Sequence, residues 1–154
     1  MIRFLRGSLE AVGEDYVVVA VGGVGYRVFV PASTLGRLPR RGEEVTLHTH
    51  LQLREDGIAL YGFLAAAEHE MFEMLVKVSG VGPRVALALI SSMRPEELHR
   101  AVLFEDAESL MSAPGVGRKL AQRLVLELKE RLGAGGGGRV GARRSGGGTR
   151  AAPA

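Results

Sequence analysis

The sequence contains no cysteine. This absence excludes disulfide scaffolds, zinc fingers, iron–sulfur sites and thiol catalysis. Long apolar runs are also missing: the longest uninterrupted one, residues 85–90, spans six residues, whereas a membrane-spanning helix needs about 20. Residues 1–6 contain no apolar stretch of the length that a secretory signal requires. We therefore expect a soluble, cytoplasmic protein with no membrane association.

Motifs of catalysis are missing as well. The chain has no Gly-x-x-x-x-Gly-Lys-Ser/Thr phosphate loop and no local signature of a nucleophile triad. His48 and His50 share one face of an expected strand, but a metal site would need a third ligand from Glu43 or Glu44. We expect an ordinary polar face there, and no metal, no cofactor and no intrinsic catalysis.

Neither basic nor acidic residues are in large excess in residues 1–132. The 154 residues include 20 basic and 17 acidic side chains, a net charge of +3. Residues 133–154 hold four arginines and no acid, which leaves 16 basic and 17 acidic residues, a net charge of −1, in residues 1–132. Binding of nucleic acid by the folded part must therefore be argued from the local placement of basic residues.

Large apolar residues are scarce at the C-terminus. Residues 133–154 contain nine glycines and a single large apolar residue, Val140. Such a segment buries too little surface to offset its ordering entropy, so we expect a disordered tail. It is either a solvated end or a basic arm that adds unspecific affinity for phosphate.

Residues 1–63 have the pattern of β structure. Strands are expected at residues 2–12, 16–21, 26–30, 45–53 and 58–63, with a short helical turn at 32–35. Five strands of this kind predict a small, partly open barrel of the OB type. An SH3-like barrel would give nearly the same pattern, and periodicity does not distinguish the two.

Residues 64–132 change to helical periodicity. Residues 85–90 are apolar on all sides and predict a buried helix, and Pro95 opens another with Glu96 and Glu97 in its first turn. Leucines at 120, 124, 128 and 132 mark one face of a final helix. The prediction is a multi-domain α+β protein: a barrel (1–63), an all-α domain (64–132) and the tail (133–154). Domains this small often gain stability by forming homo-oligomers.

An internal repeat gives the clearest functional signal. Segment 75–90, LVKVSGVGPRVALALI, recurs 35 residues later as segment 110–125, LMSAPGVGRKLAQRLV. Each copy predicts a helix, a tight Gly-Val-Gly turn and a second helix with a basic residue in its first turn. A solenoid would require more than two copies.

The chemistry of this turn favours the binding of a phosphate group. Glycines permit positive φ and remove side chains that would block a ligand. Amides of the turn and of the following helix N-terminus then form an anion site, to which Arg84, Arg118 and Lys119 add positive charge. The alternative is a plain helix connection with glycine as C-cap. Because the pattern occurs twice, we favour phosphate binding, which positions DNA without selecting a sequence.

The arrangement resembles the paired helix-hairpin-helix motif of sequence-independent DNA-binding proteins. Over residues 1–132 the resemblance is closer, to the RuvA family of bacterial proteins that bind Holliday (four-way) junctions and serve the RuvB branch-migration motor in recombination and repair. The motifs that carry it are Gly22-Gly23-Val24-Gly25-Tyr26, Arg54-Glu55-Asp56, Leu60-Tyr61-Gly62-Phe63, Ser79-Gly80-Val81-Gly82-Pro83-Arg84 and Pro114-Gly115-Val116-Gly117-Arg118-Lys119.

This resemblance implies a tetramer built by the OB fold, with hairpins that grip the duplex arms. It also implies an acidic pin at the tetramer centre, which corresponds to Glu55 and Asp56; from the residues alone, Asp56-Gly57 is simply a hairpin turn. Arg123 is added to the DNA contacts on its helical spacing from Lys119. The expected phosphate contacts are Gly80, Val81, Gly82, Arg84, Gly115, Val116, Gly117, Arg118, Lys119 and Arg123.

Expected partners follow from the family: junction DNA, a RuvB-type motor and a RuvC-type resolvase. The family normally has a third, small helical domain that binds RuvB, and this sequence shows no such pattern. We therefore do not extend activation of the motor to this chain. Three explanations of the missing pattern stay open: a truncated form, a frame-shifted reading and a naturally short form. One tetramer and a face-to-face octamer are also both open.

The expected function is sequence-independent binding of a four-way junction, which is held open for branch migration. Two alternatives stay open: a generic duplex or single-strand binder without junction preference, and an oligomeric scaffold whose hairpins only pack against each other. The OB fold has few aromatic residues, most at core-like positions, which does not favour a stacking platform for single strands.

Overall fold

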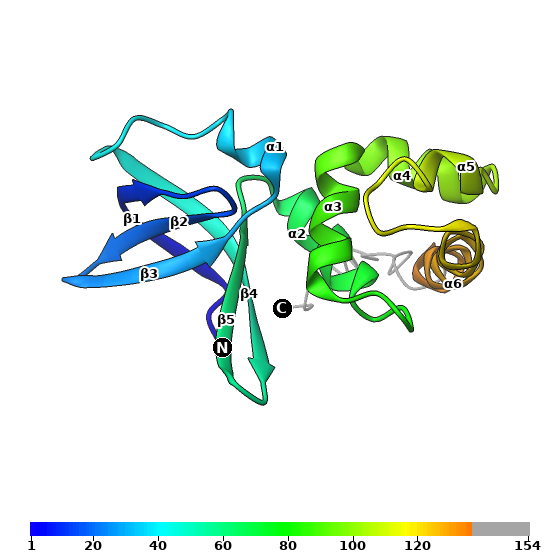
Figure 1. The fold of residues 1–154 in the computed structure, drawn as a ribbon, viewed down its shortest axis with the longest axis horizontal. Coiled ribbons are helices and arrows are strands. Elements are labelled where there is room, and N and C mark those ends of the chain that lie inside the picture. The colour runs from blue at the N-terminus through cyan, green and yellow to red at the C-terminus, as the bar shows by residue number, and fades with distance from the viewer. Residues whose placement is uncertain (137–154) are drawn as a thin grey trace, which may run out of the picture.

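The computed structural model of the chain describes residues 1–136. Five strands form one side of the molecule and the larger helices form the other (Figure 1). This order agrees with the predicted α+β architecture. The last helix continues through Gly136, so residues 133–136, which we expected in the tail, are helical; they extend an already formed helix, which needs no new nucleation. The remaining tail residues, 137–154, lie outside the described residues.

Hydrogen bonds close the strands into a barrel in the order β1-β2-β3-β5-β4. Strands β3 and β5 run parallel, and the other neighbours are antiparallel. A five-stranded barrel with this crossed order is OB-like, so the structure decides between the two barrels that alternation had left open. The strands span Phe4–Val12 (β1), Tyr16–Val21 (β2), Val24–Phe29 (β3), Glu44–Arg54 (β4) and Gly57–Phe63 (β5).

Alternating side chains fill the barrel. Val17 and Val19 of β2 are fully buried, and Val17 lies opposite the equally buried Val28 of β3. A side chain at Gly62 would place its Cβ 2.5 Å from Val28 Cγ1, so the close strand contact there requires glycine. The period-two pattern of the sequence thus corresponds to one face packed inside the barrel.

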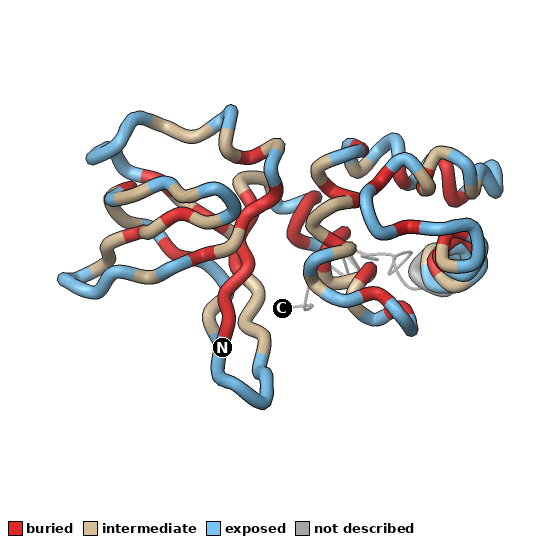
Figure 2. Tube along the Cα trace, viewed as in Figure 1, coloured by how far each residue is buried: buried red, intermediate tan, exposed pale blue. Residues whose placement is uncertain are grey.

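The β4–β5 hairpin extends beyond the rest of the barrel (Figure 1). Arg54 pairs with Gly57 at its end, which leaves Glu55 and Asp56 as a two-residue loop. Gly57 has φ 141°, a value that favours glycine. Figure 2 shows the end of this hairpin as exposed.

Two of the helices begin at residues that are typical of helix starts. Pro95 occupies the first position of its helix, with Glu96 and Glu97 in the first turn, as predicted. Asp106 caps the next helix by accepting a hydrogen bond from the Ser109 N–H at 3.2 Å. No helix of residues 1–136 is long and apolar enough to span a membrane. The helices are Ala32–Leu35 (α1), Ala66–Leu75 (α2), Pro83–Ser92 (α3), Pro95–Leu103 (α4), Ala107–Leu110 (α5) and Arg118–Gly136 (α6).

Helix α3 differs from the prediction of a helix buried on all sides. Ala86, Leu89 and Ile90 are buried, but Val85 and Leu87 are only half-buried. Leu87 is half-buried because one face of α3 lines a groove against the barrel, together with Ala88 and Phe29. Val85 lies instead near Gly115 of the second turn. An apolar sequence does not reveal that a neighbouring element leaves such a groove open.

The barrel interior is a core of its own, but strand β5 also contributes side chains to the core of the helices. Tyr61 and Phe63 of β5 belong to the same buried cluster as Phe72 and Leu75 of α2, and the Phe63 and Phe72 ring centroids lie 5.0 Å apart. The helical part is therefore packed directly onto the barrel.

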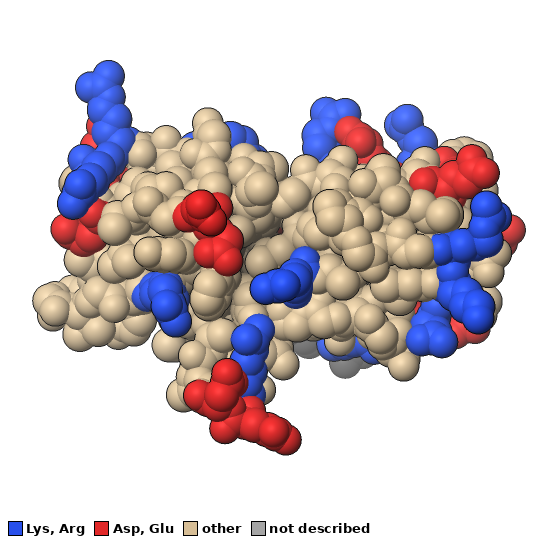
Figure 3. Space-filling model, in the orientation of Figure 1, with Lys and Arg blue, Asp and Glu red and all other residues tan. Residues whose placement is uncertain are grey.

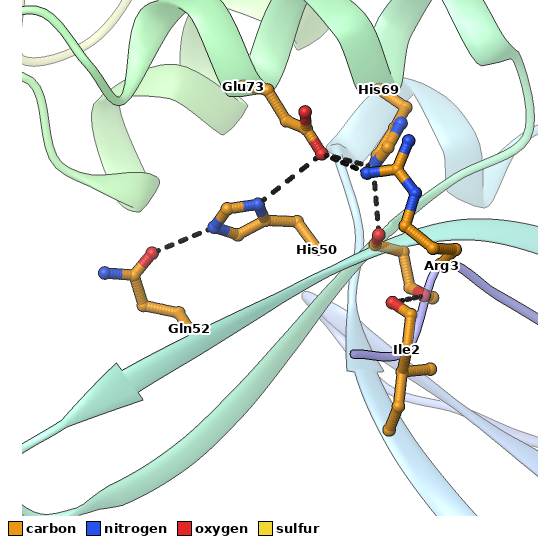
Figure 4. A network of polar contacts seen from close by, with 7 residues as sticks. Ile2, Arg3, His50, Gln52, His69 and Glu73 are labelled. Carbon is orange, nitrogen blue, oxygen red and sulfur yellow. Dashed lines mark hydrogen bonds and ion pairs between the residues drawn. The ribbon is translucent and has the colours of Figure 1, made fainter.

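Polar contacts also join the helical part to the barrel (Figure 4). His69 Nε2 lies 2.9 Å from the Thr49 carbonyl oxygen and 2.9 Å from Glu73 Oε1, and Arg3 Nη1 donates to the same Glu73 oxygen at 3.0 Å. His50 Nδ1 lies 3.8 Å from this oxygen. His50 thus faces α2, and among residues 1–136 no three His, Asp or Glu side chains are placed to hold a metal ion.

Candidate nucleic-acid interface

The two copies of the repeat fold into two similar hairpins, α2–turn–α3 and α5–turn–α6. Gly80 has φ 87° and Gly115 has φ 86°, so the first glycine of each turn adopts the conformation that disfavours other residues. The second glycine differs: Gly82 is extended with φ −89°, and a Cβ added at Gly82 or at Gly117 would meet no atom within 4 Å. One glycine thus permits the turn, and the other keeps its surface open.

The side chain of the central valine of each turn is buried. Val81 and Val116 are each 6% exposed. Their N–H groups donate within the turn, Val81 to Val78 O at 3.1 Å and Val116 to Ala113 O at 3.2 Å. The side chains of both valines are therefore buried, and their N–H groups are used inside the turns.

Other amides near the turns have no hydrogen-bond acceptor within residues 1–136. The first helical-type bonds after the turns are Ala86 N–H to Gly82 O at 3.1 Å and Ala121 N–H to Gly117 O at 2.9 Å. The N–H groups ahead of these bonds are the ones that a helix N-terminus offers to an anion. Between Val81 and Ala86, and between Val116 and Ala121, the N–H groups with no acceptor within residues 1–136 are those of Gly82, Arg84 and Val85 in the first hairpin and Gly117, Arg118, Lys119 and Leu120 in the second.

Basic side chains flank these amides. Arg84 lies in the first turn of α3, and Arg118 and Lys119 begin α6. All three side chains are exposed. Their charges add to the positive end of each helix dipole, so both hairpins present the combination of amides and cations that binds phosphate.

The hairpins pack on one another reciprocally. A Cβ at Gly80 would lie 3.7 Å from Leu120 Cδ1, and a Cβ at Gly115 would lie 3.6 Å from Val85 Cγ2. Val85 and Leu120 are equivalent positions of the 35-residue repeat. Each turn therefore rests on the second helix of the other hairpin, which fixes the spacing between the two turns.

The acidic residues lie apart from the hairpins. Glu55 and Asp56 are exposed at the end of the β4–β5 hairpin, where Figure 3 shows a group of acidic side chains. Just behind them Arg54 donates a hydrogen bond to the Tyr61 hydroxyl. Burial raises the pKa of Tyr61, and the positive charge of Arg54 opposes this shift.

Comparison with known proteins places these features in a family. Residues 1–62 match the family model described as RuvA N terminal domain, and residues 72–130 match a SAM-like helix-hairpin-helix tandem. A protein of Symbiobacterium thermophilum named "Holliday junction branch migration complex subunit RuvA" is 57% identical over 141 residues, which cover 90% of this chain and 69% of that protein. The chain belongs to the RuvA family.

Further relatives carry the same name. The protein of Gloeobacter violaceus is 52% identical over 136 residues, 86% of this chain and 66% of its own length. That of Halorhodospira halophila is 48% identical over 146 residues, 95% of this chain and 72% of its own length. The chain thus spans about two thirds of the length of the RuvA relatives it matches.

The structure brings most of the predicted residues together. Gly80, Gly82 and Arg84 lie in one turn, and Gly115, Gly117, Arg118 and Lys119 lie in the other. Arg123 extends from α6 toward the first turn, where its Nη1 donates to Ser79 O at 3.3 Å. Val81 and Val116 shape the turns from inside. Glu55 and Asp56 lie together on the separate hairpin.

Arg54, which was noted only as part of a motif, and Phe29 were not among the expected contact residues. Both line the groove between the barrel and α3. The available signal for Arg54 was its position directly before Glu55. Phe29 gave no signal, because alternation places it only as one aromatic residue of a strand.

Proposed function

We propose that this chain binds four-way DNA junctions without sequence preference and holds them open for branch migration. The observation that carries the proposal is the pair of hairpins with matching glycine φ angles, 87° and 86°, and reciprocal packing. Its RuvA relatives are named as subunits of a Holliday junction branch migration complex. Two phosphate sites at a fixed spacing suit a DNA duplex, whose backbone is the same for every sequence.

Each hairpin binds one stretch of backbone. Amides of Gly82 and Arg84, and of Gly117 and Lys119, donate to phosphate oxygens, and the Arg84, Arg118 and Lys119 side chains supply charge. Val81 and Val116 hold the turns in place from below. Arg123 connects the hairpins through Ser79 and adds its charge to the first one.

The acidic pin acts at the crossover. In a tetramer built around the barrels, the Glu55 and Asp56 pairs of all copies meet where the strands exchange. Their charges repel phosphates there and direct the strands toward the hairpins. The repulsion acts over about 10 Å at 0.1 M salt. We assign the chain a DNA-binding role within a complex, in which a RuvB-type motor supplies the energy for strand movement.

The double variant Arg118→Gln/Lys119→Gln tests this function. Loss of charged hydrogen bonds to phosphate should weaken binding to a synthetic four-way junction about tenfold or more. Fluorescence anisotropy measures the affinity, and light scattering measures the assembly state of the same samples. Arg100→Gln, on the exposed surface of α4, removes one positive charge away from the hairpins and is the control. Unchanged junction affinity in the double variant would contradict the proposal and leave a scaffold as the better description.

A further inference from the structure

A groove of about 650 Å³ separates the barrel from helix α3. Figure 3 shows basic side chains beside the region where the barrel meets the helical part. The groove has an aromatic and aliphatic floor and charged edges. Its main lining residues are Phe29, Arg54, Tyr61, Arg84, Leu87 and Pro114.

The floor offers a flat aromatic surface. The Phe29 and Tyr61 ring centroids lie 5.7 Å apart. Phe29 is half-buried, whereas Tyr61 is 3% exposed, so Phe29 is the ring that a ligand can cover. The Arg27 guanidinium lies over the Phe29 ring, 5.3 Å from its centroid. An aromatic ring beside guanidinium groups is the kind of surface on which nucleobases stack.

The charge of the groove favours an anion. Arg54 and Arg84 line it from opposite sides, the barrel and α3, and Asp15 is the acid that lines it. Arg54 is fixed by its hydrogen bond to Tyr61. A neutral apolar partner would remove both guanidiniums from water without a compensating charge, which is costly. A ligand with a flat apolar part and a negative part satisfies both features.

The position of the groove connects the two proposed DNA-contact regions. Arg54 directly precedes the acidic pin, Arg84 follows the turn of the first hairpin, and Pro114 precedes the turn of the second. A strand that passes from the crossover to the hairpins therefore passes this groove. We propose that the groove binds one unstacked nucleotide of such a strand, with its base on Phe29 and its phosphate between Arg54 and Arg84. This inference rests on the proposed junction binding.

A tryptophan reporter tests the stacking. The chain contains no tryptophan, so Phe29→Trp places a single indole in the groove. Its emission should be quenched when a four-way junction or a single-stranded oligothymidylate binds, and not when a blunt duplex binds. Phe104→Trp, at a residue that is 77% exposed and away from the groove, is the control and should keep its emission with all three DNAs.

Anisotropy of labelled DNA in the same samples separates this inference from the function on which it rests. Junction bound without quenching at position 29 would overturn the groove site and leave junction binding intact. Equal quenching by blunt duplex would also overturn it. A change in the emission of Phe29→Trp with protein concentration alone would show that a second copy of the chain fills the groove, which would again overturn it.

Affinity provides a second test. Phe29→Leu should lower junction affinity about fivefold or more, because a stacking contact is lost, and should leave duplex affinity unchanged. Phe4→Leu, on an exposed phenylalanine of β1, is the matched control. Because Phe29 also contacts the core, Arg54→Gln at an exposed position provides a variant that keeps the core, with the same selective loss expected. Equal loss for junction and duplex in both variants would contradict the groove site.

Discussion

Arg123 of α6 donates a hydrogen bond from Nη1 to the carbonyl oxygen of Ser79, 3.3 Å away. The guanidinium of the second hairpin therefore lies at the turn of the first. A Cβ at the neighbouring Gly80 would lie 3.2 Å from the same nitrogen. Arg123 thus contacts both hairpins, which pack as one unit. Such packing would hold the two proposed phosphate sites at a fixed spacing.

The first glycine of each turn should control stability. Gly115→Ala places a side chain at φ 86°, so we expect the free energy of unfolding to fall by about 1–2 kcal/mol. Urea denaturation measures this change. Gly36→Ala, at φ −80° with no atom within 4 Å of a Cβ, is the control and should cost far less. Equal stability of Gly115→Ala and the parent protein would refute the assignment of strain to this glycine.

The second glycine should control binding instead. Gly82 has φ −89° and open space around it, so Gly82→Ala should change stability by no more than about 0.5 kcal/mol. The added methyl group would stand between the turn amides and a phosphate, and junction affinity should fall about tenfold. Titration of labelled junction measures this loss. Full affinity together with full stability would show that this turn does not contact DNA.

Much of this architecture could be predicted from the sequence. Strand β2 and helix α1 have the expected bounds, 16–21 and 32–35, because a β-branched run between turn residues and a proline before a helical turn are local signals. The hairpins were predictable because the repeat places equal residues 35 positions apart. The barrel order was not, since it depends on the parallel pairing of β3 with β5, which no local pattern encodes.

The remaining site features depend on contacts between distant segments. Which glycine of Gly-Val-Gly takes positive φ, and that the valine N–H is used inside the turn, follows from the packing of each turn on the opposite hairpin. The groove combines residues from position 15 to position 114. Arg123 was included on helical spacing, and the structure supplies its actual contact, the Ser79 carbonyl.

Asp106 should make the second hairpin sensitive to acid. Its hydrogen bonds from Ser109 lower its pKa, so the charged cap stabilises α5 above the ordinary carboxyl pKa of about 3.9 and loses this effect as the pH falls through the lowered value. The Tm of Asp106→Ala should therefore lie below that of the parent at pH 7, and this gap should narrow as the pH falls through the lowered pKa. Asp106→Asn keeps a neutral acceptor, and its difference from Asp106→Ala should not vary with pH. A gap that persists unchanged in acid would rule out the charged cap.

The acidic pin should act through charge. Glu55→Gln/Asp56→Asn should bind the junction more tightly than the parent at low salt, because repulsion of phosphate is removed. The difference should vanish near 1 M salt, where the screening length is about 3 Å. Glu43→Gln/Glu44→Gln removes the same charge from another exposed site and should leave the affinity much closer to that of the parent. Weaker binding of the pin variant at low salt would contradict this role.

The central claim is preference for a four-way junction, and a gel-shift titration tests it most directly. An immobile junction, a duplex of the same length and the single strands are each titrated at two salt concentrations. We predict tight junction binding that persists at the higher salt, where duplex binding is lost. Equal affinities for junction and duplex that fall steeply together with salt would mean generic phosphate binding alone, and would contradict the account.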